Sequence, residues 1–121
     1  MSSIEWFDGG DADAIYGLLG QEYEHPTRLL PALCPVCGQL GVHLAFHAWY
    51  DTRPSRGGGW AWCSSCHGYG HGSWVVPVWW RNIPGVSIHD LTFSPGTLDD
   101  RAALVDEHWN LLVNELERVT T

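Results

Sequence analysis

The chain has 121 residues, of which 45% are hydrophobic, and its 14 acidic and six basic residues give a formal net charge of −8. This length suits one domain and is too short for two independent cores. Every basic residue is an arginine. A chain with this acidic excess and no lysine lacks the clustered cations that release counterions from nucleic acid, so its charge favours a basic partner instead.

The N-terminal region is predicted to form a short helix. From Asp11 to about Glu22, apolar residues recur at i, i+3, i+4 and i+7, which is typical of an amphipathic helix. The dipeptide His25-Pro26 ends it, and residues 29–33 form an extended lead into the first cysteine. No stretch is long and apolar enough to span a membrane, and the first residues do not resemble a secretory signal. We therefore expect a cytoplasmic protein.

The middle of the chain is predicted to form a three-stranded antiparallel sheet. Apolar residues alternate over Gln39–Asp51, which indicates a strand with one buried face and with His43 and His47 on its outer face. Residues 52–59 are typical of a loop, and 60–62 of the returning strand of a hairpin. The glycine-rich residues 68–72 are expected to turn, and residues 73–80, which include Pro77, to form an edge strand.

The clearest helical pattern spans residues 97–120, where apolar residues repeat in steps of four and three. The predicted fold class is therefore α+β: a three-stranded sheet flanked by a short N-terminal helix and a long C-terminal amphipathic helix. We expect a single domain over residues 1–121. Within it, 1–33 form the first helix and lead-in, 34–80 the sheet, 81–96 a connecting loop and 97–120 the last helix.

Two Cys-x-x-Cys pairs stand out, Cys34–Cys37 and Cys63–Cys66, with 25 residues between them. Two thiolates three positions apart on a tight turn point at one ion, and a hairpin between the pairs brings the two turns together. Four thiolates complete a tetrahedral shell and leave no position for a catalytic water. We predict one structural Zn²⁺ bound by these four cysteines.

The motifs Cys34-Pro-Val-Cys37-Gly38 and Cys63-Ser-Ser-Cys66 resemble those of the zinc-ribbon family over about residues 34–80. This resemblance implies a fold element and a metal but not a role. Rubredoxins, which bind iron through similar knuckles, differ in having Pro and Gly where this chain has Ser64 and His67. A thioredoxin-like redox site would need an α/β pattern around a pair, which is not found. Hydrogen bonding of His67 or His71 to a cysteine sulfur, or their replacement of a cysteine, remains open.

The eight tryptophans are too many for one small core, and exposed tryptophan beside arginine is typical of protein interfaces and of base-stacking surfaces. No catalytic motif is found, and we predict that the chain is not an enzyme. In size and charge it resembles small bacterial immunity proteins, which neutralise a basic toxin. We predict an acidic protein-binding module, with a nucleic-acid-binding zinc ribbon as the alternative; the oligomeric state is not predicted. The predicted partner-binding residues are Trp49, Trp60, Trp62, Arg53, Arg56, Trp79, Asp99, Asp100, Asp106 and Glu107.

Overall fold

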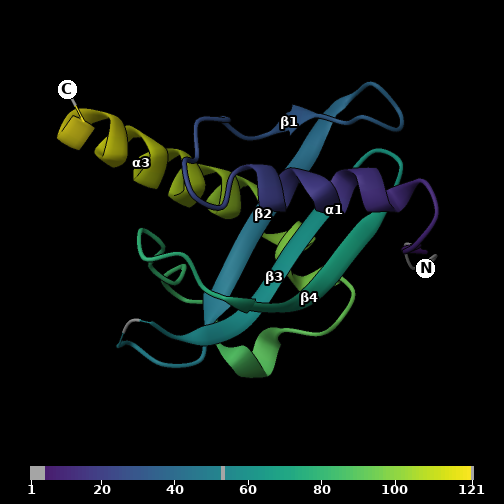
Figure 1. The fold of residues 1–121 in the computed structure, drawn as a ribbon. Helices are drawn as coiled ribbons and strands as arrows, with labels where there is room; N and C mark the ends of the chain where they lie inside the picture. Colours follow the sequence, from purple (N-terminus) through teal and green to yellow (C-terminus); the bar gives the residue numbers. More distant parts are fainter. Residues whose placement is uncertain (1–4, 53, 121) are drawn as a thin grey trace.

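The computed structural model describes residues 5–52 and 54–120. Its central element is an antiparallel sheet of four strands in the order β1-β2-β3-β4 (Figure 1). The strands are β1 (Ala32–Leu33), β2 (Leu40–Ala48), β3 (Arg56–Cys63) and β4 (Tyr69–Val75). Each strand pairs with its neighbour along the chain, as expected for hairpin connections. The predicted α+β class is confirmed, with four strands in place of three.

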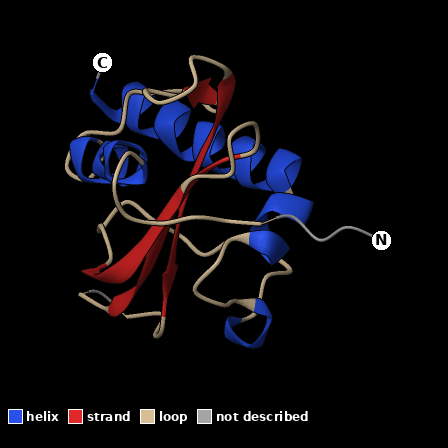
Figure 2. Cartoon of the chain, turned by 90° about the vertical axis from the view of Figure 1, so that its right-hand side faces the viewer, coloured by secondary structure: helices blue, strands red, loops and turns tan. Residues whose placement is uncertain are grey.

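Helical segments lie on both sides of this sheet (Figure 2). Helix α1 (Ala12–Gln21) packs on β3 and β4, and α3 (Ala102–Thr120) packs against β2. The 3-10 helix η1 (Ile88–Asp90) and helix α2 (Gly96–Asp100) belong to the segment that covers the opposite face from α1. Among the described residues, no helix has both the length and the apolar character needed to cross a membrane.

The predictions of a loop at 52–59 and of a turn at 68–72 were wrong in part, because the glycines of these stretches lie largely inside strands β3 and β4. These strand positions are occupied by glycine because neighbouring groups come too close for a side chain. A Cβ atom at Gly70 would lie 2.4 Å from the Tyr16 ring of α1, and one at Gly57 would lie 2.0 Å from the carbonyl oxygen of His47. Strand β4 therefore begins at Tyr69, and it ends at Val75, before Pro77.

Replacing Gly57 by alanine should destabilise the protein by about 3 kcal/mol or more, because backbone atoms of β2 cannot move aside as a flexible side chain can. Gly17 provides the matched control, since it lies inside α1 and a Cβ added there would meet nothing within 4 Å. Gly17→Ala should stabilise by about 0.5–1 kcal/mol, the ordinary gain in helix propensity. Urea unfolding of the two variants tests both values, and a well-tolerated Gly57→Ala would contradict the observed register.

Strand β2 is buried on both faces from Gly41 to Ala48, so the prediction of one outer face was wrong. On one side Phe46 lies in a cluster of aromatic rings: Tyr23, Trp74, Trp79, Trp80 and Trp109. On the other side His43 faces Asp106 of α3. Strand β2 is thus an inner strand, and its two histidines, His43 and His47, are buried.

The predicted C-terminal helix is divided in two at Arg101. The backbone of Arg101 leaves the helical region (φ −116°, ψ 30°), and its guanidinium donates a hydrogen bond to the carbonyl oxygen of Gly85. The break allows α2 to hold Asp99 against Trp62 while α3 runs along β2. The apolar periodicity was correct, but periodicity carries no signal for a change of axis.

Candidate metal centre

The four cysteines meet at one end of the sheet. Cys34 directly follows β1 and Cys63 ends β3, while Cys37 and Cys66 lie on the turns that lead into β2 and β4. All four are free thiols, and their sulfur atoms lie within 4.8 Å of one another. The two pairs that the sequence singled out are therefore brought together as predicted.

The two turns that carry these cysteines have the same local structure. The residue after the second cysteine is left-handed in both, with φ of 76° at Gly38 and 68° at His67. Its N–H donates to the carbonyl oxygen of the first cysteine, at 3.0 Å in the first turn and 2.9 Å in the second. His67 thus adopts the conformation that usually requires glycine there, with its ring edge-on to Trp6. Both turns aim their sulfurs in the same way.

Two of the distances between the sulfurs match the edge length of a tetrahedral metal site. The Cys34 and Cys66 sulfurs are 3.9 Å apart, and those of Cys37 and Cys63 are 3.7 Å apart. A tetrahedron with metal–sulfur bonds of about 2.3 Å has edges of about 3.8 Å. The separations are far longer than a disulfide bond of about 2.05 Å. The arrangement is therefore compatible with one bound metal ion.

Backbone and burial set the thiol chemistry of this cluster. The N–H groups of Val36 and Ser65 point at the sulfurs of Cys34 and Cys63, at 3.3 Å and 3.4 Å. Burial raises the pKa of the Cys63 thiol to about 12, whereas a backbone hydrogen bond from Gln39 lowers that of Cys37. A divalent cation reverses the cost of a buried thiolate, because its charge favours the deprotonated sulfur.

The histidines do not join the cluster. Among the described residues, the cysteines are the only group of three or more potential ligands whose ligand atoms converge. His71 lies instead against Trp60, with ring centroids 4.5 Å apart. His43 and His47 are 5% and 8% exposed inside the sheet layer.

Burial lowers the pKa of the His47 imidazole from its ordinary 6.5. The unfolded chain takes up this proton near pH 6.5 and the folded chain only at lower pH, so the folded state loses stability as pH falls through that window. We expect the free energy of unfolding to fall between about pH 7.5 and about pH 5.5, and to fall less steeply in His47→Gln. Because metal release also contributes in acid, the comparison of the two slopes isolates His47. Equal slopes would contradict a neutral buried imidazole.

A hydrogen-bonded chain links the second cysteine turn to both C-terminal helices. His43 faces Asp106 through Nδ1 at 2.6 Å and Ser64 through Nε2 at 2.8 Å. The Ser64 hydroxyl donates to Asp99 at 2.5 Å, and the indole N–H of Trp62 donates to the same carboxylate oxygen. The single hydroxyl proton of Ser64 thus goes to Asp99 and not to the imidazole, unlike that of a serine nucleophile.

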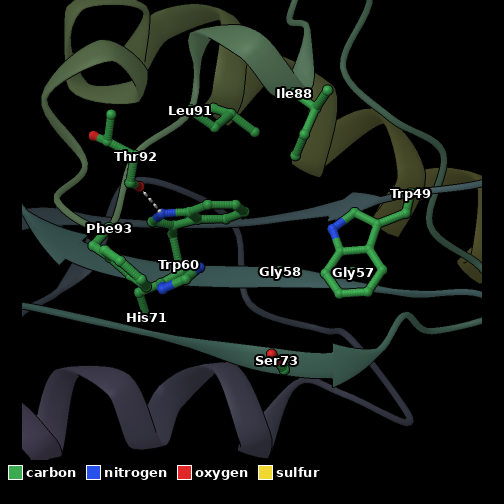
Figure 3. Close-up of a pocket in the computed structure, with 10 residues that line it drawn as sticks. All are labelled: Trp49, Gly57, Gly58, Trp60, His71, Ser73, Ile88, Leu91, Thr92 and Phe93. Atoms are coloured by element: carbon green, nitrogen blue, oxygen red, sulfur yellow. Dashed lines mark hydrogen bonds between the residues drawn. The ribbon is translucent and has the colours of Figure 1, made fainter.

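The predicted partner-binding residues fall into three groups. Trp62 is fully buried, Asp99 and Asp106 bond inward, and the Trp79 indole donates to the carbonyl oxygen of Tyr23. Exposed on the surface are Arg56, Asp100 and Glu107, whereas Arg53 lies outside the described residues. Trp49 and Trp60 line one pocket of about 420 Å³ (Figure 3).

The pocket also contains residues that the sequence did not single out. Ile88, Leu91 and Phe93 come from the segment predicted only as a connecting loop, and they have no regular spacing that would reveal a common face. His71 faces the pocket from β4, directly opposite Trp60 in the strand register. A correct assignment of β4 would have placed His71 and Ser73 on the face of Trp60.

The spacing of the cysteines and the geometry of their four sulfur atoms both point to a metal centre. Comparisons with protein-family models, with curated proteins and with solved structures gave no match. The chain has four cysteine sulfurs close together at the end of its four-stranded sheet, and this cluster could hold a metal ion.

Proposed function

We propose that this chain is a non-catalytic protein-binding module, stabilised by one structural Zn²⁺ in a zinc-ribbon arrangement, whose acidic surface meets a basic protein. The observation that carries the proposal is the closed set of four sulfurs, because a complete shell of four ligands favours a structural ion and leaves binding to the rest of the surface. Zinc is favoured over iron because Ser64 and His67 depart from the rubredoxin pattern.

The distribution of charge supports a basic partner. Arg28 and Arg81 lie beside Glu22 and Glu115, and Arg101 is bonded to a backbone carbonyl, so at least three guanidinium groups of the described residues are already engaged. Exposed carboxylates are spread over both flanks of the sheet: Glu5, Asp8, Asp11, Asp13, Glu24, Asp51, Asp100 and Glu107. Such a field attracts cations and accelerates their association.

The same charges argue against the nucleic-acid alternative. Phosphate binding requires several clustered cations, and arginines that are already paired release fewer counterions from a nucleic acid.

The hydrogen bonds of Ser64 favour a non-catalytic role, since they link the metal turn to α2 and β2 instead of activating the hydroxyl oxygen. An inhibitor of a basic enzyme, similar to an immunity protein, is the form of this function that we favour.

Affinity capture from the native source tests the proposal. With the tagged 121-residue chain as bait, we expect one basic protein at near-stoichiometric yield, released by rising salt and unaffected by nuclease. Reconstitution from purified components must then reproduce the complex and, if the partner is an enzyme, inhibit it at equimolar ratio. Material that is lost on nuclease treatment would support the nucleic-acid alternative and overturn ours.

A charge variant gives the matched control for this capture. The double variant Asp100→Asn with Glu107→Gln removes two exposed charges, and we expect weaker partner binding by about three- to tenfold with a smaller salt dependence. Asn114→Ala changes an exposed, uncharged residue on helix α3 and should bind like the unaltered chain. Equal binding by all three proteins would place the partner elsewhere on the surface.

A further inference from the structure

The pocket of about 420 Å³ lies between the sheet and the segment that follows β4 (Figure 3). In the view of Figure 3, Gly58 of β3 lies between the rings of Trp60 and Trp49, and Ile88 and Leu91 face the same space from the covering segment. Phe93 and His71 lie together beside Trp60 (Figure 3). The pocket is therefore lined by rings and aliphatic groups around a strip of bare backbone.

The inner wall of this pocket is held in place before any ligand arrives. The Trp60 indole N–H donates to the carbonyl oxygen of Thr92 at 2.9 Å, and His71 packs against the ring. A Cβ atom at Gly58 would lie 2.6 Å from the Trp60 ring, so glycine allows the ring to lie close against the strand. A fixed ring binds a planar group without the entropic cost of ordering itself.

The outer wall leaves a large apolar area in water. Trp49 is 50% exposed, Phe93 76% and Ile88 45%. Exposed rings grouped around a preformed apolar pocket are typical of sites that receive the anchor residue of a partner.

The lining selects an uncharged group. None of the ten lining residues is acidic, lysine or arginine, and burial lowers the pKa of His71, which keeps its ring neutral. The Thr92 hydroxyl is already bonded to the carbonyl oxygen of Ser94. Among the described residues, neither the His71 ring nor the Ser73 hydroxyl has a hydrogen-bond partner, so each can form a hydrogen bond with a bound group.

We propose that this pocket receives one uncharged aromatic side chain from the basic protein partner, while the net negative charge of the chain attracts the basic residues that flank this side chain in the partner. This inference rests on the proposed function and names the contact that anchors it. The net charge of −8 favours a protein over a nucleic acid as the source of the ring, because a base of a nucleic acid comes with a negatively charged phosphate, which the acidic chain repels. A peptide with flanking cations brings the complementary charge.

Short peptides test the pocket without the natural partner. Arg-Gly-Trp-Gly-Arg is titrated into the ¹⁵N-labelled, metal-loaded chain, and the indole N–H signals are assigned with Trp49→Phe and Trp60→Phe. We expect shifts confined to the Trp49 and Trp60 signals, about tenfold weaker binding when the central residue is alanine, and weaker binding again with flanking glutamates. Equal binding by the tryptophan and alanine peptides, or tighter binding of a pentathymidine oligonucleotide at these signals, would overturn the proposal.

Two variants connect the pocket with the partner. Ser73→Phe places a ring in the pocket from exposed Ser73 and should abolish the peptide-induced shifts. Tyr50→Ala removes an exposed ring next to Trp49 that does not line the pocket, and it should bind like the unaltered chain. If the captured partner binds Ser73→Phe normally, the pocket inference fails and the proposed function stands. If the peptide binds as expected but no basic partner exists, the proposed function fails instead.

Discussion

Replacing Cys63 by serine should leave the chain largely unfolded at room temperature. Binding of structural Zn²⁺ contributes about 10 kcal/mol or more in zinc-finger peptides, whereas the net stability of a small domain is about 5–15 kcal/mol. Cys63 ends β3 and is fully buried, so the lost ligand also leaves a polar group inside the sheet layer. Far-ultraviolet circular dichroism and the dispersion of the amide signals measure the loss.

Val36→Ala supplies the control for this experiment, because Val36 lies between two cysteines and is 38% exposed. It keeps all four sulfurs and should change the free energy of unfolding by no more than about 1 kcal/mol. A Cys63→Ser protein that unfolds with the same midpoint as Val36→Ala would show that the cysteines do not stabilise the fold through a metal.

Asp99→Ala is expected to cost roughly 2–4 kcal/mol of stability, since it removes the acceptor for two donors at once. The Trp62 side chain is fully buried, so its indole N–H loses its acceptor away from solvent, and the Ser64 hydroxyl loses its acceptor beside the metal turn. Urea unfolding of the metal-loaded protein measures the loss. Asp99→Asn, which keeps one oxygen acceptor, should recover part of it.

Asp100 is the matched control, as the neighbouring carboxylate on the same helix α2. It is exposed, and Asp100→Ala should change stability by less than about 0.5 kcal/mol. Equal losses in Asp99→Ala and Asp100→Ala would contradict the hydrogen-bonded chain between Ser64 and α2. The two variants therefore distinguish Asp99 from Asp100, both of which the sequence predicted to be partner-binding residues.

Features set by neighbours along the chain could be predicted from the sequence. The apolar spacing around Ile15 places α1 at Ala12–Gln21, within one residue of its predicted ends. The cysteine turns are equally local, because each pair of sulfurs is set by a few residues of backbone. The strand over Gly57–Gly59 could not be predicted in this way, since glycine has low strand propensity and only the close approach of β2 and of the Trp60 and Trp74 rings requires it.

Contacts between distant segments account for the remaining differences. His43 and Asp106 are 63 positions apart, and nothing in either segment indicates that α3 would place a carboxylate on the buried histidine. The pocket combines Trp49, directly after β2, with residues of β3, of β4 and of the segment around Phe93, so its lining depends on strand register and on the path of an irregular segment. Side chains alternate along a strand, so Trp60 and Trp62 lie on one face of β3, but alternation cannot tell which of the two rings is covered by α2.

Metal analysis of the natively purified chain tests the central claim most directly. We predict one zinc ion per chain by elemental analysis and native mass spectrometry, bound with four deprotonated cysteines, and loss of the folded circular dichroism spectrum when a chelator removes it. A stoichiometric amount of iron with a coloured protein would contradict the identity of the metal. An apoprotein that keeps its fold and its dispersed indole signals would contradict the structural role of the four cysteines.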